Sequence, residues 1–185
     1  MNKASNVSTG KPKITGAIWR APFGTTLPTD AVTALDAAFK CVGYIAEDGV
    51  ENEDNIETDS YKAWGGDVVI VFQTEKTDTF AWSMIETLNV DVLKAYYGDD
   101  NVTGSLDDGI VVRSNAADMG TNAWVIDLNL RGAVRRIVIP QAAVSEKGTI
   151  TYKDDEVVAY PMTVTAEAYE GYDGDTHREY TKKAV

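Results

Sequence analysis

The sequence contains few of the residues that most often carry chemistry. Its 185 residues include one cysteine, Cys41, and one histidine, His177. A single cysteine cannot form an internal disulfide, and one cysteine with one histidine cannot supply the four ligands of a structural zinc site. His177 lies in a polar C-terminal stretch, so we expect a solvated side chain and not the positioned base of a Ser-His-Asp or Cys-His catalytic arrangement. We therefore predict that the chain is not an enzyme and has no catalytic residue, cofactor or metal.

Long apolar segments and an excess of positive charge are also missing. No stretch approaches the roughly 18 apolar residues that cross a bilayer, and residues 1–13 contain no apolar signal region. We therefore expect no membrane insertion, and folding in a cytoplasm. Lysine and arginine number 17 against 29 aspartates and glutamates, a net charge of −12. A nucleic-acid binder needs a basic face, so this balance argues against one. It is compatible with a surface that repels DNA within a Debye length of roughly 8–10 Å.

What the sequence does contain is a set of strand patterns. Trp124–Arg131 and Met162–Tyr169 alternate between two kinds of side chain, which predicts strands with two different faces. Asp67–Gln73 contains a continuous apolar run, typical of a strand covered on both faces. Short helices fit Asp30–Phe39 and Asn89–Tyr97. Because no βαβ rhythm is present, we predict a mainly β fold, an antiparallel sandwich or barrel with one flanking helix plus a second short helix.

An acidic segment separates the early strands from the central one. Glu47–Asp59 cannot bury itself, so we expect an exposed loop or protruding hairpin. Solvated acids explain the segment most simply, and an irregular cation site is the alternative. Trp64 follows beside two glycines, and an aromatic residue in polar surroundings can anchor a neighbouring subunit. We expect a turn at Thr77-Asp78.

Both ends of the chain are polar. We expect residues 1–13 to form a flexible N-terminal arm and residues 170–185, too polar to pack, to form a C-terminal arm. Residues 14–169 are predicted to form a single domain, from which residues 47–66 protrude.

Three stretches carry a resemblance to a known family. They are Tyr61–Thr87, Tyr44–Val50, and an opening segment made of Gly16–Pro22 and Gly24–Thr29. Their ordered combination resembles the major tail (tail tube) proteins of siphophages that infect Gram-positive bacteria, particularly actinobacteria. The resemblance covers most of residues 14–90, and the later strand patterns are compatible with it.

The resemblance implies an architecture and a role. It implies a phage tail tube-like fold, similar to the tubes of contractile tails and type VI secretion, with two packed antiparallel sheets and a flanking helix. Hexameric rings would stack head to tail into a hollow virion tail, through which the genome is delivered to the host cell. Residues 47–66 and the two arms would contact the next ring.

Head-to-tail stacking requires unlike surfaces on the two ring faces. The contact residues that we expect are Glu51, Glu53, Asp54, Glu57, Asp59 and Trp64 of the loop, with Lys11, Lys13, Arg131, Arg135 and Arg136 as basic acceptors. The implied partners are other copies of the chain, a tape measure protein and viral DNA in the lumen, and terminator and distal tail proteins at the ends. The alternatives are a tail terminator or distal tail ring protein, and a β-sandwich module that binds carbohydrate or a receptor.

Overall fold

The computed structural model describes residues 2–184 and is mainly β. Nine strands form one antiparallel sheet in the order β3-β2-β8-β9-β10-β5-β4, with β1 beside β8 and β11 beside β9, and β6 and β7 form a small second sheet. The strands are β1 (Lys11–Pro12), β2 (Ile18–Pro22), β3 (Lys40–Cys41), β4 (Ile45–Lys62), β5 (Val68–Met84), β6 (Val102–Ser105), β7 (Gly109–Val112), β8 (Thr121–Leu130), β9 (Ala133–Lys147), β10 (Tyr160–Ala166) and β11 (Arg178–Lys183). The helical elements are α1 (Val90–Tyr97) and three 3₁₀ turns, η1 (Ala4–Asn6), η2 (Asp99–Asn101) and η3 (Glu170–Tyr172).

The large sheet buries apolar side chains on both of its faces. The main core joins β5, β8, β9, β10 and α1 and includes Phe80, Trp82 and Trp124. A smaller cluster lies on the other face of β8, where Val125 packs with Phe39 and Tyr172. The alternation in β8 therefore separates two buried faces and not a buried face from a wet one. The prediction of a mainly β antiparallel fold with a flanking helix is confirmed.

The flanking helix α1 begins and ends at the residues that the sequence indicated. The Asn89 side chain accepts a hydrogen bond from the Asp91 N–H at 3.0 Å, which satisfies a free donor of the first turn. Gly98 follows the last turn with a φ of 98°, a conformation that glycine adopts at little cost. Leu93 and Tyr96 are buried against the main core.

The prediction of a second helix at Asp30–Phe39 is wrong. Within Asp30–Phe39 the chain is irregular, because side chains bind its backbone in place of helical neighbours. The Asp30 carboxylate accepts hydrogen bonds from the Thr33 and Val32 N–H groups, at 2.6 and 2.7 Å. Hydrogen bonds from the Thr33 hydroxyl and from these two N–H groups lower the Asp30 pKa to about 2. Such local bonds compete with a helix.

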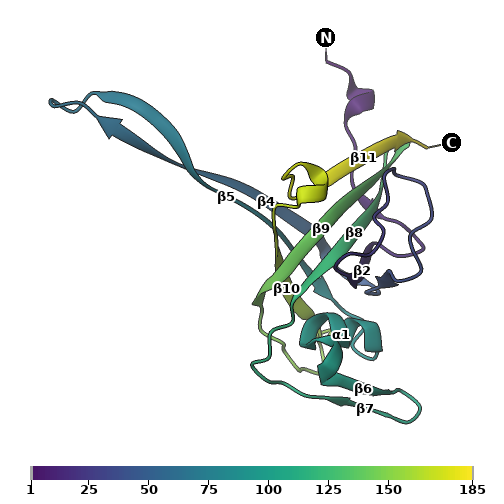
Figure 1. Cartoon of the computed structure of the whole chain (residues 1–185). Coiled ribbons are helices and arrows are strands. Elements are labelled where there is room, and N and C mark those ends of the chain that lie inside the picture. Colours follow the sequence, from purple (N-terminus) through teal and green to yellow (C-terminus); the bar gives the residue numbers. More distant parts are fainter. Residues whose placement is uncertain (1, 185) are drawn as a thin grey trace.

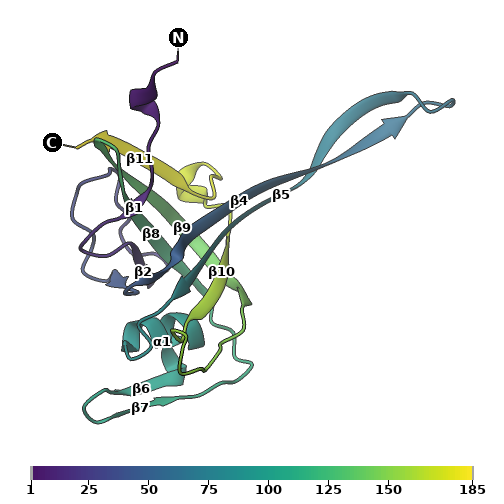
Figure 2. The same cartoon turned by 180° about the vertical axis from the view of Figure 1, so that it is seen from behind.

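Strands β4 and β5 form a hairpin that leaves the body of the molecule, as Figure 1 and Figure 2 show from opposite sides. The acidic segment lies in this hairpin, which is longer than the expected residues 47–66. The turn predicted at Thr77-Asp78 is wrong, because both residues pair with β4 and β5 continues through them. The chain reverses instead at Ala63–Asp67, where Gly65 and Gly66 have φ values of 113° and 99°.

The C-terminal segment packs against the body, contrary to the expectation that it is too polar to do so. β11 pairs with β9 from Arg178 opposite Val138 to Lys183 opposite Ala133. Pairing uses backbone hydrogen bonds, which polar residues supply as well as apolar ones. Tyr172, just before β11, is buried in the smaller cluster. The N-terminal segment is tied to β8 through β1, whose Lys11 lies opposite Asn129, and through the Lys13 N–H, which donates to the Asp127 carbonyl.

Candidate functional surfaces

Surfaces, and not an enclosed pocket, are the candidate functional features. Among residues 2–184, no group of three or more His, Cys, Asp or Glu side chains is placed to hold a metal ion. None of the helices in this part of the chain is long and apolar enough to span a membrane. Two hollows on one side of the sheet are open and lined mainly by small and acidic residues, and a third lies over segment 30–39 beside Lys13 and Arg136.

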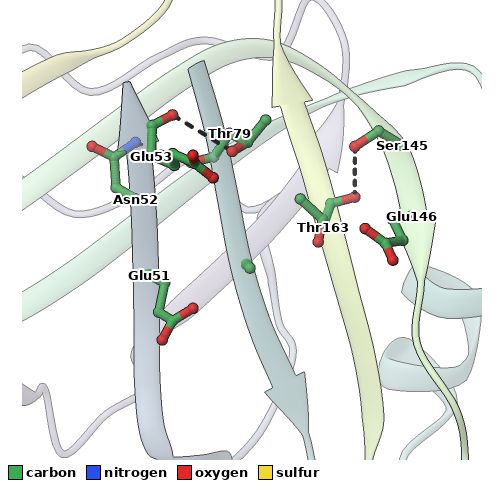
Figure 3. Close-up of a pocket in the computed structure, with 8 residues that line it drawn as sticks. Glu51, Asn52, Glu53, Thr79, Ser145, Glu146 and Thr163 are labelled. Atoms are coloured by element: carbon green, nitrogen blue, oxygen red, sulfur yellow. Dashed lines mark hydrogen bonds between the residues drawn. The ribbon is translucent and has the colours of Figure 1, made fainter. Parts of the chain in front are cut away.

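The main hollow lies on the uncovered side of β4, β5, β10 and β9, which we call the open face (Figure 3). Register places its side chains in rows across the four strands. One row runs Glu51, Ala81, Thr163, Glu146, with acids at both ends and small residues between them. The next row runs Glu53, Thr79, Thr165, Ala143.

The charged side chains that line the open face are all acidic. Lys147 follows Glu146 directly, but its ammonium group lies on the core side, 5.2 Å from the Tyr96 ring centroid. Alternation along β9 therefore places the acid on the open face and the exposed cation on the opposite side of the sheet. The open face presents carboxylates and hydroxyls with no cation beside them.

The part of the hairpin next to the body is acidic, and we call it the shank (residues 51–59 with 73–79). All five acids expected to make contacts lie there on β4, exposed: Glu51, Glu53, Asp54, Glu57 and Asp59. Asp54 pairs with Lys76 at 3.4 Å, and both side chains are 44% exposed. Glu57 lies directly opposite Glu75, a destabilising arrangement of like charges that a nearby cation would relieve.

The end of the hairpin is apolar, and we call it the tip (residues 60–72). Five consecutive β5 residues, Val68–Phe72, are between 37% and 69% exposed. Trp64 at the turn is fully exposed, and the Tyr61 ring stacks on Phe72 with centroids 5.6 Å apart. The run predicted to be covered on both faces is thus uncovered within the single chain. A contiguous apolar surface of this kind marks an interaction site.

A basic end surrounds the β8–β9 turn, on the side of the body where the N- and C-termini lie (Figure 1). Exposed Arg131 lies in this turn, and Lys11, Lys182 and Lys183 flank it on β1 and β11. The other basic residues expected to make contacts are already paired. Arg135 bonds Glu179 at 2.9 Å with both side chains part exposed, and Lys13 lies 3.5 Å from Asp127.

Arg136 does not belong to this surface, which corrects its expected role as an acceptor. Its side chain is 2% exposed and donates to both Asp127 carboxylate oxygens, at 2.7 and 2.9 Å. It also donates to the Thr33 carbonyl at 2.7 Å. Arg136 is buried because segment 30–39 lies against it, and the Asp30 and Thr33 carbonyls accept its hydrogen bonds. Arg136 therefore stabilises the fold.

Sequence reasoning also missed a polar junction at the base of the hairpin, which we call the clasp. Asp78 is buried where β5 leaves β10, and Ala166–Asp78 is the last β10–β5 pair. Its carboxylate accepts hydrogen bonds from Asn52 at 2.8 Å and from Thr176 at 2.6 Å, and it bonds the His177 Nδ1 at 2.6 Å. His177 is thus bound and not solvated as expected. One sequence signal could have revealed the clasp: Asp78 is a polar residue at a position where the alternation of β5 otherwise places an apolar side chain.

The protonation of the clasp follows from these contacts. Burial would raise the Asp78 pKa, but the hydrogen bonds from His177, Thr176 and Asn52 together lower it. The hydrogen bond to Asp78 raises the His177 pKa, against the opposing effect of burial. Both shifts favour the charged forms, so folding favours an ion pair between Asp78 and His177.

Comparison with known proteins identifies one family. A family model described as phage tail tube protein matches residues 6–177. Among solved structures, one similar chain is the anti-feeding prophage cap, described as its tube terminating cap, at 10% identity over the full length of both chains with a TM-score of 0.42. No curated protein gives a significant match.

Proposed function

Because the chain belongs to the phage tail tube protein family, we propose that it is the structural subunit of a siphophage tail tube. In this proposal six copies form a ring, rings stack head to tail, and the genome passes through the hollow centre into the host cell. The family match over residues 6–177 carries the proposal. Other copies of the chain are the main partners, with a tape measure protein and DNA inside and terminator and distal tail proteins at the ends.

The open face is the surface best suited to line the lumen. Glu51, Glu53 and Glu146 would repel the DNA backbone, and no lysine or arginine lines the hollow to bind it. The side chains between these acids are small or hydroxylated, and β10 contributes Thr163. With six copies, each ring would present 18 carboxylates from these three positions. DNA could then slide without adhering.

The outer part of the shank, residues 54–59 with 73–77 beyond the open face, and the basic end are the surfaces best suited to stacking. The shank carries unneutralised acids, including the opposed pair Glu57 and Glu75. The basic end carries Lys11, Arg131 and Lys183, whose side chains are exposed. A shank docked on the basic end of a copy in the next ring would join unlike surfaces, and a contact of this kind that does not close on itself forms a filament.

Electron microscopy of concentrated protein tests the proposal. We expect long tubes of constant diameter, with a critical concentration that rises with salt because screening weakens the stacking contact. Single rings that never stack would indicate a terminator or distal ring instead. A protein that remains monomeric at high concentration by analytical ultracentrifugation would refute a tube subunit.

A second experiment tests the lumen assignment separately. The triple variant Glu51→Lys, Glu53→Lys and Glu146→Lys should still form tubes if these residues contact no neighbour, and the tubes should now retain added double-stranded DNA fragments. Wild-type tubes are the control and should release the fragments on washing. Equal retention by both would place the open face elsewhere than the lumen.

A further inference from the structure

The hairpin leaves the body at one residue, Asp78. Strand β5 pairs with β10 from Met84 opposite Tyr160 to Asp78 opposite Ala166, and β10 ends there. From Thr77 outward, β4 is the strand partner that the structure gives to β5. A two-stranded ribbon is only marginally stable by itself, so the ribbon alone does not fix the direction of the hairpin. Asp78 is therefore the position at which the hairpin can pivot on the body.

The clasp lies on this pivot and holds both strands of the hairpin. One oxygen of the Asp78 carboxylate on β5 accepts a hydrogen bond from Asn52 on β4. The other oxygen binds Thr176 and His177 of the C-terminal segment. Asn52 also donates to the Thr79 carbonyl at 3.0 Å, across the two strands. Figure 2 shows the C-terminal segment beside the point where β4 and β5 leave the body. A further element thus joins the hairpin where β10 stops supporting it.

The C-terminal side of the clasp is fixed to the body. Arg178 begins β11 directly after His177 and lies opposite Val138 of β9. Its guanidinium carbon lies 4.2 Å from the centroid of the Tyr172 ring, and its guanidinium group donates to the Tyr172 carbonyl at 3.0 Å. The His177 ring packs edge-on against Phe80 of the core, with centroids 5.2 Å apart. The clasp therefore joins the part of the chain that can pivot to a part that β9 and the core hold.

We propose that the clasp is a pH-sensitive lock on this pivot. While His177 is protonated, the C-terminal segment holds the hairpin in one direction relative to the body, and loss of that proton loosens the hairpin. Geometry carries the proposal, because one buried carboxylate receives bonds from β4 and from the C-terminal segment at the residue where β10 ends. The lock belongs to the single subunit, so the inference goes beyond the proposed function and does not require tubes to form.

The imidazole is the part of the clasp whose bond changes in strength near neutral pH. A hydrogen bond between charged partners is roughly twice as strong as a neutral one, so a neutral His177 binds Asp78 more weakly. The charged groups that face the ring are Asp78 on β5, Asp54 on β4 with its partner Lys76, and Glu179 on β11 with its partner Arg135. The three carboxylates raise the His177 pKa, and burial opposes them. The lock is thus closed below the unfolded pKa of about 6.5 and weakens as pH rises through the folded pKa.

A distance measurement between two spin labels tests the lock on the monomer, at a concentration too low for assembly. The labels are attached to Asp59→Cys in the shank and Ser145→Cys on β9, in a Cys41→Ala background that removes the single native thiol. Strand geometry places the two positions within about 40 Å of each other, inside the range of double electron–electron resonance. We expect the distance distribution at about pH 9 to be roughly twice as wide as at about pH 6, because the bond from His177 is then about half as strong.

Two variants and one control separate the lock from other effects of pH. Asp78→Asn removes the carboxylate without changing the size of the side chain, and His177→Gln removes the titrating ring. Both should give the wide distribution at either pH. Arg135→Ala is the control, because it breaks the pair with Glu179 on β11 and leaves Asp78 untouched, and it should behave like the unaltered clasp.

The outcomes that would overturn the proposal are distinct. An equally narrow distribution at both pH values would show that the proton on His177 does not control the hairpin. An unchanged width in Asp78→Asn would show that the clasp does not hold it. The comparison of the two pH values uses the unaltered clasp, so it decides the question even where a variant fails to fold.

The single histidine of the chain makes a second readout unambiguous. In a proton NMR titration of the monomer, the imidazole signals belong to His177 alone, and we expect their midpoint above about 6.5. The widening of the distance distribution should follow the same titration curve. A different midpoint would mean that another group controls the pivot, and the proposal would be wrong. Failure of the protein to form tubes would leave both measurements on the monomer unaffected.

Discussion

Removing the Asp78 carboxylate should destabilise the monomer more than removing any exposed acid of the hairpin. In Asp78→Ala the donors of Asn52, Thr176 and His177 lose their shared acceptor. A buried donor left unsatisfied costs about 1–3 kcal/mol. Asn52 is exposed and His177 part exposed, so water compensates some of this loss. We expect a decrease of about 3 kcal/mol in the free energy of unfolding, equivalent to roughly 6–12 °C in melting temperature for a chain of this size.

The assay is thermal and urea unfolding of the monomer, monitored by circular dichroism at a protein concentration too low for assembly. Asp59→Ala is the matched control, because Asp59 is an exposed β4 carboxylate that lies opposite Phe72, away from the clasp. An exposed substitution of this kind changes stability by less than about 0.5 kcal/mol. Hydrogen exchange should also show faster exchange of residues 170–177 in Asp78→Ala alone. Equal stability of the two variants would refute the idea that the clasp joins the C-terminal segment to the hairpin.

The clasp also predicts a direction of pH dependence. The His177 pKa is raised by folding, so its contribution is complete below the unfolded pKa of about 6.5 and is lost as pH rises through the folded pKa. The Asp78 pKa is lowered, so its contribution is complete above about 3.9 and is lost as pH falls through the folded pKa. Stability from the clasp should be greatest between about pH 4 and 6.5. In His177→Gln the loss above pH 6.5 should disappear, and its persistence would contradict this account.

Three further predictions concern other parts of the molecule. Arg136→Ala should cost about 3–5 kcal/mol in urea unfolding, because it leaves Asp127 buried without its partner, whereas Arg135→Ala should cost less than about 1 kcal/mol. Lys182→Glu with Lys183→Glu should leave the melting temperature within about 2 °C of wild type, since an exposed substitution costs less than about 0.5 kcal/mol, yet should raise the threshold concentration for tubes. Gly65→Val should increase hydrogen exchange at the hairpin turn without changing global stability, because the cost of its φ of 113° is local.

Much of the fold could be predicted because alternation is a local property of the sequence. It identified β8, β10 and the apolar run of β5, and capping residues identified α1. The helix expected at Asp30–Phe39 failed because Asp30 and Arg136 bind that backbone, and Arg136 is 106 positions away from Asp30. A periodic pattern of residues contains no information about a contact between positions so far apart in the sequence. For the same reason the packing of β11 on β9 was not predictable from its polar composition.

The candidate surfaces also differ in whether the sequence alone could predict them. The exposed acids of the shank and the exposed Trp64 could be predicted, because a dense run of charge cannot be buried. The open face could not be predicted from the sequence. Its rows of side chains form only when strand pairing brings Glu51, Ala81 and Thr163 side by side across three strands. The clasp likewise needs Asn52, Asp78 and His177 to meet from distant segments.

Strand β5 also has a mechanical consequence. Its 17 residues carry the tip at one end and Trp82 in the core at the other. At about 3.3 Å per residue the strand spans at most roughly 56 Å, because its ladder with β4 contains register shifts. A force on the tip is therefore transmitted along this strand to the core. The Trp82 ring lies 5.0 Å from that of Trp124, a pair whose exciton coupling is sensitive to small rotations. The near-ultraviolet circular dichroism of this pair would then report, from inside the subunit, how far the hairpin is deflected.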